Sequence, residues 1–292
     1  MTKRNRFRVT AVVAGLALSG AVAVGLFARA ESVPVLELRE QTHIHGLAVD
    51  RQDPENLLIA THHGLFRAGP GGEAERISVV QDFMGFTPHP SDPSTLYASG
   101  HPADGGNLGF IASTDGGANW EQVSLGEGGP VDFHQMTVSP ADPMVVYGAF
   151  GGLQVSRDGG KTWSVAGPLP ERLIDLAASA QDADTLYAAT ESGLLVSKDA
   201  GGTWAAAVEG SPVSLVEVTP DGTLYAFVLG QGLLRSGEGE LDLASVGADW
   251  GDRILLHLAV DPANKDRTFV ASHQGNILAS KDGGATWSEF GR

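Results

Sequence analysis

Three short segments carry side chains that could bind a metal ion or perform acid–base chemistry. Each segment places two such residues two positions apart: His43-Ile-His45, Asp82-Phe-Met84 and Asp132-Phe-His134. In a β-strand, residues i and i+2 lie on the same side, so each pair would face one direction. Neutral imidazole is a common metal ligand, and a methionine thioether beside imidazoles favours copper over calcium or magnesium.

The ligand types and their grouping predict a metal site. The chain has no Cys, so a thiolate site is excluded and the donors must be histidine, methionine and carboxylate. We expect its core to be His43, His45, Met84 and His134. The further candidates are the other histidines near the same strand ends: His62, His63, His101 and His273. Copper is favoured and zinc is the alternative; without such a site, no cofactor is expected.

The same region also supports a second hypothesis, a glycoside hydrolase. Such an enzyme needs two carboxyl groups, about 5–5.5 Å apart for retention or 6.5–9.5 Å for inversion. The candidates are Asp82, Asp132 and Glu191, with Asp249 and Asp252 as further acids. Arg172 and Arg253 could orient a substrate, and Trp250 could stack on a sugar ring. A third hypothesis is a module that binds or assembles a protein partner.

An internal repeat supplies the framework for these residues. The pattern Ser-x-Asp-x-Gly-x-x-Trp occurs four times, and its Asp and Trp residues are Asp115 and Trp120, Asp158 and Trp163, Asp199 and Trp204, and Asp282 and Trp287. Glycine supplies positive φ, the carboxylate accepts local backbone N–H groups, and the indole packs the turn against its neighbour. The pattern is therefore typical of a hairpin turn.

A second repeat precedes each turn. An apolar strand, an Asp, Pro or Ser turn and another apolar strand recur six times, about 40 residues apart. In the second strand, one register is predicted to hold Ile59, Tyr97, Tyr147, Tyr187, Tyr225 and Val270, and another to hold His63, His101 and Glu191. Six four-stranded units predict an all-β protein, a six-bladed β-propeller over residues 43–292. Strand alternation places the four turns on one face, here called the bottom face, and the starts of the first strands on the opposite top face.

The four turns resemble the Asp-box (BNR) repeat of sialidases, sortilin-type receptors and the photosystem II assembly factor. The chain from His43 onward is similar to secreted bacterial propellers labelled glycosyl hydrolases or sialidase-like. The resemblance implies that the Asp box is a fold element and not a catalytic site. Sialidases use a Tyr nucleophile. The resemblance further implies that a sialidase would need a clamp of three Arg for the substrate carboxylate. All four Tyr here occupy core positions, so sialidase activity is not expected.

The N-terminus predicts export. Residues 1–8 are basic, residues 11–27 are apolar apart from Ser19, and Ala28-Arg29-Ala30 follows. This order is typical of a secretory signal peptide over residues 1–30, with an uncleaved anchor as the alternative. Residues 31–42 could add an outer strand to the last blade, a place that residues 288–290 could also fill. The net charge of −16 argues against a nucleic-acid partner. We therefore expect a periplasmic or extracellular protein, not membrane-bound beyond its signal, whose partner is a metal ion, a glycan or a protein.

Overall fold

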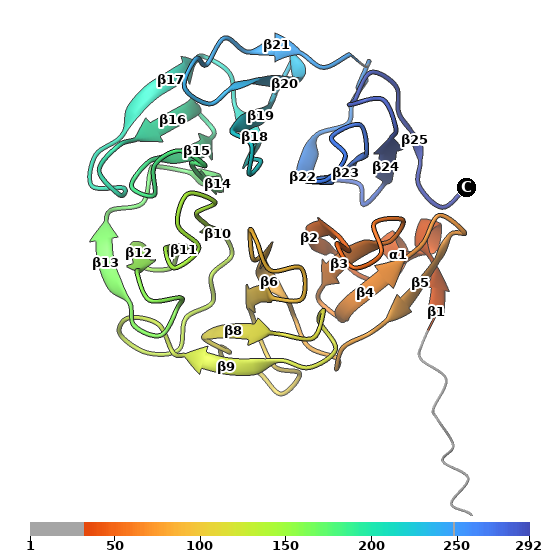
Figure 1. The fold of residues 1–292 in the computed structure, drawn as a ribbon, viewed down its shortest axis with the longest axis horizontal. Coiled ribbons are helices and arrows are strands. Elements are labelled where there is room, and N and C mark those ends of the chain that lie inside the picture. The colour runs from red at the N-terminus through yellow and green to blue at the C-terminus, as the bar shows by residue number, and fades with distance from the viewer. Residues whose placement is uncertain (1–31, 248) are drawn as a thin grey trace, which may run out of the picture.

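The structure, a computed structural model, describes residues 32–247 and 249–292, and the predicted signal peptide lies outside them. Six antiparallel sheets surround a central axis in chain order, which confirms the six-bladed β-propeller (Figure 1). Within that described part, no helix is long and apolar enough to cross a membrane.

Each blade is built from one continuous stretch of chain, with its first strand innermost. Blade 1 contains β2 (Ile44–Val49), β3 (Leu57–Thr61), β4 (Gly64–Ala68) and β5 (Glu73–Arg76). Blade 2 contains β6 (Met84–Pro88), β7 (Leu96–Ser99), β8 (Phe110–Ser113) and β9 (Glu121–Ser124). Blade 3 contains β10 (Met136–Val138), β11 (Val146–Ala149), β12 (Leu153–Ser156) and β13 (Ser164–Gly167).

The second half repeats this order. Blade 4 contains β14 (Leu173–Ala178), β15 (Leu186–Thr190), β16 (Gly193–Ser197) and β17 (Ala205–Glu209). Blade 5 contains β18 (Val213–Val218), β19 (Thr223–Val228), β20 (Gly232–Gly237) and β21 (Ala244–Ser245). Blade 6 contains β22 (Leu255–Val260), β23 (Thr268–Ser272), β24 (Ile277–Ser280) and β25 (Ser288–Glu289).

The segment before blade 1 joins the ring in an unexpected way. Strand β1 (Ser32–Pro34) pairs with β5 as a fifth strand of blade 1, and helix α1 (Val35–Gln41) follows. Of the two segments that could fill the outer place of blade 6, residues 288–290 supply it through β25 (Ser288–Glu289), and residues 31–42 do not. Val35 and Leu38 are buried in one apolar cluster with Phe269 and Phe290 of the blade 6 segment. The segment therefore connects the two ends of the ring by side-chain packing.

The four Asp-box turns are hydrogen-bonded alike. In the turn of blade 3, Ser156 Oγ donates to Asp158 Oδ1 (2.8 Å) and accepts the Gly160 N–H (2.8 Å). Asp158 Oδ1 accepts the Thr162 N–H (2.9 Å) and its Oδ2 accepts the Thr162 hydroxyl (2.7 Å). The antiparallel registers set these turns at the opposite end of the blades from His45, as expected.

The backbone corrects the expected registers of the second strands. The residue just after a first strand donates its backbone N–H to the carbonyl of a residue just before the second strand: Asp50 to Asn56, His89 to Thr95, Ser179 to Thr185 and Asp261 to Arg267. The four acceptors are therefore equivalent, and so are the residues two positions after them, which are Leu58, Tyr97, Tyr187 and Phe269. The prediction that Ile59 and Val270 share the tyrosine position is therefore off by one residue. The four tyrosines are buried, as predicted from their repeated register.

A β-bulge recurs near the top end of several first strands. In blade 1, Ile44 pairs with Thr61 and Gly46 pairs with Ala60, which leaves His45 as the extra residue. The extra residue is Ile174 in blade 4, Ser214 in blade 5 and Leu256 in blade 6. A bulge changes the direction of a side chain without ending the sheet. The same bulge therefore carries an imidazole in blade 1, a hydroxyl in blade 5 and an apolar side chain in blades 4 and 6.

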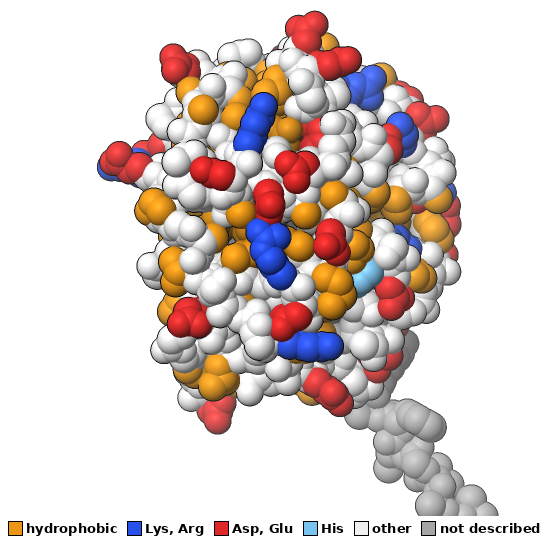
Figure 2. All heavy atoms as spheres, turned by 60° about the vertical axis from the view of Figure 1, so that its left-hand side comes forward, with side chains coloured by type: hydrophobic (Ala, Val, Ile, Leu, Met, Phe, Trp, Pro, Cys, Tyr) orange, Lys and Arg blue, Asp and Glu red, His pale blue; other side chains and the backbone are white. Residues whose placement is uncertain are grey.

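The core lies between neighbouring blades, whose apolar faces form six buried clusters. On the outer side near β13 and β17, acidic and basic side chains are interspersed with apolar ones (Figure 2). The chemistry predicted for the protein lies on the top face.

Candidate metal centre

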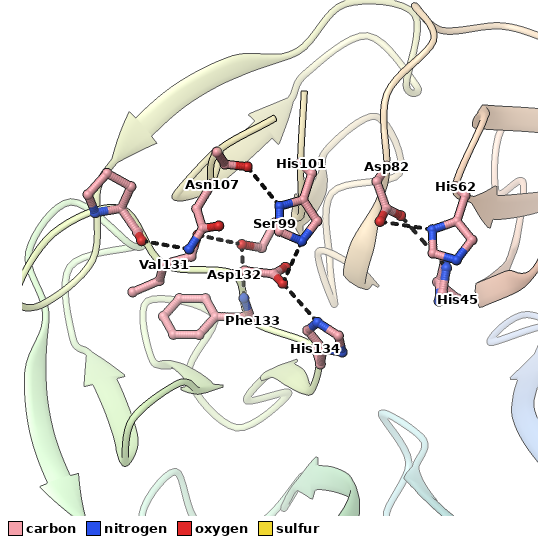
Figure 3. Close-up of polar contacts among 12 residues, drawn as sticks. His45, His62, Asp82, Ser99, His101, Asn107, Val131, Asp132, Phe133 and His134 are labelled. Atoms are coloured by element: carbon pink, nitrogen blue, oxygen red, sulfur yellow. Dashed lines mark hydrogen bonds and ion pairs between the residues drawn. The ribbon is translucent and has the colours of Figure 1, made fainter. Parts of the chain in front are cut away.

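Two groups of three side chains on the top face have ligand atoms that all lie within 4.8 Å of one another. Cluster A consists of His45, His62 and Asp82, and cluster B consists of His101, Asp132 and His134. Figure 3 shows that in both clusters the histidines converge on a central carboxylate. Two imidazoles and one carboxylate form a nitrogen–oxygen donor set suited to zinc, copper(II) or iron(II).

Cluster A lies at the boundary of blades 1 and 2. His62 Nδ1 is 2.9 Å from Asp82 Oδ2, and His45 Nε2 is 3.7 Å from Asp82 Oδ1. The latter two atoms are buried and have no hydrogen-bond partner. Burial, together with the nearby imidazoles of His62 and His257, lowers the pKa of His45 to about 3. His45 is therefore neutral at physiological pH, and an imidazole lone pair is available to a cation.

Cluster B lies at the boundary of blades 2 and 3. Asp132 Oδ2 is 3.0 Å from His101 Nε2 and 2.8 Å from His134 Nε2. The carboxylate is buried, and its other oxygen, Oδ1, has no hydrogen-bond partner. The hydrogen bond to Asp132 raises the pKa of His134. Asp132 and His134 are in contact although both precede β10 (Met136–Val138), whereas Met84 lines the channel and Asp82 does not, so the expectation that each pair would face one direction does not hold for Asp82 and Met84.

His101 has acceptors at both ring nitrogens. Its Nδ1 lies 2.7 Å from the Gly106 carbonyl oxygen, so Nδ1 carries the proton and donates. Its Nε2 faces the Asp132 carboxylate, which also only accepts. Either a second proton or a cation must lie between Nε2 and the carboxylate. A ring N–H donated to a backbone carbonyl is the usual support of a metal-binding histidine, because it fixes the tautomer.

Further contacts hold the segment that carries Asp132. Ser99 is fully buried, and its hydroxyl accepts the Phe133 N–H (3.0 Å) and donates to the Gly109 carbonyl (2.8 Å). Asn107, in the inserted loop of blade 2, donates to the Pro130 carbonyl (3.0 Å). Figure 3 shows the contact between Ser99 and Phe133 and the position of Asn107 beside cluster B. Neither Ser99 nor Asn107 could be identified from the sequence, because neither is a metal-ligand type or part of the repeat.

The two clusters are copies of one arrangement. In blades 2, 4 and 6 a residue just before the first strand is hydrogen-bonded through its backbone to a residue just after the second strand: Asp82 with His101, Arg172 with Glu191 and Ile254 with His273. With the corrected register, His62 occupies the same position as His101, and His63 does not. Hence the His62–Asp82 and His101–Asp132 pairs are equivalent across successive blade boundaries.

Met84 takes the blade 2 position that His45 takes in blade 1 and His134 takes in blade 3. All three line a central channel of about 710 Å³. The channel extends from the top-face histidines to the turns between the first and second strands at the bottom face. Met84 is buried and belongs to neither cluster. The expected core of His43, His45, Met84 and His134 is thus divided, and the two aspartates of the hydrolase hypothesis occupy the cluster centres.

The other predicted ligands lie around the clusters. His43 is exposed, and its ring meets that of His62 edge-on at 5.6 Å between centroids. His63 is exposed, next to His62 in the chain. His273 Nδ1 accepts the Ile254 N–H (3.2 Å), which holds that ring within blade 6.

The residues predicted to hold a glycan are dispersed. Trp250 is only 7% exposed and packs against Trp287 and Phe227, which leaves little of its ring open to a sugar. Arg172 donates to Glu191 (2.7 Å) within blade 4, away from the clusters. Arg253 and Asp249 line a separate small cavity beside Trp250.

Comparison with known proteins supports the repeat and the fold. Residues 154–165 match the BNR/Asp-box repeat, and they contain the turn of blade 3. The chain is therefore a six-bladed β-propeller with Asp-box repeats. No curated protein matches it.

Several solved structures share the fold at low identity. A GH74 xyloglucanase from Xanthomonas campestris is 17% identical, with a TM-score of 0.58 over 85% of this chain and 45% of that chain. YCF48 bound to a D1 peptide is 18% identical, with a TM-score of 0.53 over 90% and 86%. The extracellular domain of BT4673, a hybrid two-component system of B. thetaiotaomicron, is 13% identical, with a TM-score of 0.56 over 85% and 33%. This chain spans less than half of the xyloglucanase, and these likenesses show the fold alone.

Proposed function

We propose that this protein is an exported metal-binding propeller that holds one zinc or copper(II) ion in each of clusters A and B. One observation carries the proposal. The described part of the chain has six buried side-chain polar atoms without a hydrogen-bond partner, and three of them belong to the clusters: His45 Nε2, Asp82 Oδ1 and Asp132 Oδ1. Unpaired buried polar atoms are costly, and an ion between the donors would satisfy them.

The distances fit this assignment. Zinc lies about 2.0–2.2 Å from imidazole nitrogen and carboxylate oxygen, so two ligands of one ion are about 3–4 Å apart. His45 Nε2 and Asp82 Oδ1 are separated by 3.7 Å. In cluster B the donors lie closer together, at 2.8 and 3.0 Å, so its carboxylate must rotate slightly to admit an ion.

The surroundings of the aspartates favour metal binding over glycoside hydrolysis. A glycosidase needs one carboxyl group that keeps its proton and gives it to the leaving group. Asp82 and Asp132 are instead each surrounded by two histidines. Copper over zinc remains the prediction from Met84, which lines the channel together with His45 and His134.

The test is metal stoichiometry of the mature chain without a histidine tag. After chelator treatment and dialysis against zinc or copper(II), elemental analysis should give two ions per chain. Asp82→Asn and Asp132→Asn should each give one, and the double variant none. His63→Gln is the matched control, because His63 is exposed and outside both clusters, and it should retain two. Wild-type protein that retains no ion would refute the proposal.

A further inference from the structure

The first step concerns how many ligands the chain supplies to cluster A. Three donor atoms converge there, from His45, His62 and Asp82. Structural zinc sites are closed by four protein ligands, whereas sites with three keep a position for water or another ligand. An ion in cluster A would therefore have a free coordination position unless another side chain moved in.

The second step concerns where that position points. His45 and His62 both line the central channel, whereas Asp82 lies behind them and does not. A free position on the imidazole side of the ion would face the channel, whose volume of about 710 Å³ is in the range of small-molecule pockets. A molecule in the channel could reach the ion.

The third step concerns the chemistry of that molecule. A divalent ion beside the Asp82 carboxylate and neutral imidazoles leaves one net positive charge, which favours an anionic ligand. Elsewhere around the ring the channel wall is apolar at Ile174 in blade 4 and at Leu256 in blade 6, the neighbour of blade 1, at the positions equivalent to His45. One net positive charge balances one carboxylate, and the polar lining contributed by Asp175 and Glu217 lies farther along the channel.

We infer that the ion of cluster A binds a small monocarboxylate from the channel, with its carboxylate on the ion and its apolar tail against Ile174 and Leu256. This inference rests on the proposed metal binding. Such a ligand would gain affinity with tail length until the tail fills the apolar side, by about fourfold for each buried methylene group.

The test is calorimetric titration of zinc-loaded and metal-free protein with acetate, butyrate and hexanoate, with butylammonium as the oppositely charged control. Zinc-loaded protein should bind butyrate at least tenfold more tightly than metal-free protein does, and it should not bind butylammonium. Leu256→Ser, which places the blade 5 residue type in blade 6, should lower hexanoate affinity several-fold and leave acetate affinity unchanged. Val165→Ser is the control, because Val165 is an exposed valine on β13.

The zinc content separates the two hypotheses. If the chain holds zinc in cluster A but no carboxylate binds, the coordination is closed and the inference is wrong. Equal carboxylate binding with and without zinc would also overturn it. If the chain holds no zinc, the proposed function itself fails.

Discussion

Aspartate occurs at both ends of this propeller in different surroundings. On the bottom face, Asp158 accepts hydrogen bonds at both oxygens from its own turn, and the Thr162 side chain and backbone, with Ser156, lower its pKa to about 2. On the top face, Asp82 and Asp132 each keep one buried oxygen without a partner. A carboxylate whose oxygens are all bonded within its own segment holds the fold, whereas one with unpaired oxygens among histidines can bind a ligand.

The largest expected effect follows from removing a top-face carboxylate. Asp132→Asn should lower zinc affinity at cluster B by more than the about 10–100-fold typical of losing an outer partner, because it removes a charged ligand. Calorimetric titration would measure this. The fold should persist, since the contacts of the Asp132 carboxylate are with His101 and His134 on the top face and not with an Asp-box turn. A variant that binds zinc normally would contradict the comparison.

A bottom-face substitution should have the opposite pattern. Ser156→Ala leaves the buried Gly160 N–H without its acceptor and removes a donor to Asp158. The expected loss is about 1–3 kcal/mol in the free energy of unfolding, measured by urea denaturation. Zinc stoichiometry should remain two. A changed stoichiometry in a folded variant would mean that the two faces are not independent.

A buried positioning residue should affect both properties. Ser99→Ala removes the hydroxyl that holds the Phe133 N–H next to Asp132. We expect a stability loss of about 1–3 kcal/mol and an affinity loss of about 10–100-fold at cluster B only. Cluster A, monitored in the Asp132→Asn background, provides the internal control. An equal loss at both clusters would indicate general loosening of the fold.

The last prediction concerns a third class of carboxyl group, in the channel, where the expected effect depends on pH. Desolvation of the Glu217 carboxyl group in the channel, followed by repulsion from the nearby Asp175, raises the pKa of Glu217 from 4.5 to about 8. A carboxyl group with a raised folded pKa favours folding fully below its unfolded pKa, and that contribution is lost as pH rises toward the folded pKa. Glu217→Gln should therefore raise the melting temperature at pH 8.5 and leave it nearly unchanged at pH 4.5. Glu209→Gln, at an exposed position on β17, should show no such difference.

The repeat allowed the fold to be predicted, because the Asp-box pattern specifies a turn through local contacts. Ser156, Asp158 and Thr162 lie within seven residues, so spacing alone identifies their bonds. Ring closure depended on long-range packing instead. Helix α1 places Leu38 against Phe269 and Phe290, and periodicity carries no information about such a contact.

The residues of the candidate site were predicted from the sequence, but their division into two clusters was not. The unequal distribution of histidines identified the top face and blades 1 to 3. The one-residue register error hid the equivalence of His62 and His101, and with it the repeated His–Asp pair. The role of Asp82 and Asp132 as cluster centres depends on contacts across blade boundaries, which strand alternation within one blade does not specify.

The most direct test of the central claim is anomalous diffraction at the zinc edge from crystals of the zinc-loaded mature chain. We expect two peaks on the top face, one between His45 Nε2 and Asp82 Oδ1 and one among His101, Asp132 and His134. Crystals of Asp82→Asn should retain only the second peak. Zinc peaks at the Asp-box turns alone, or none on the top face, would contradict the assignment of the unpaired carboxylates to metal binding.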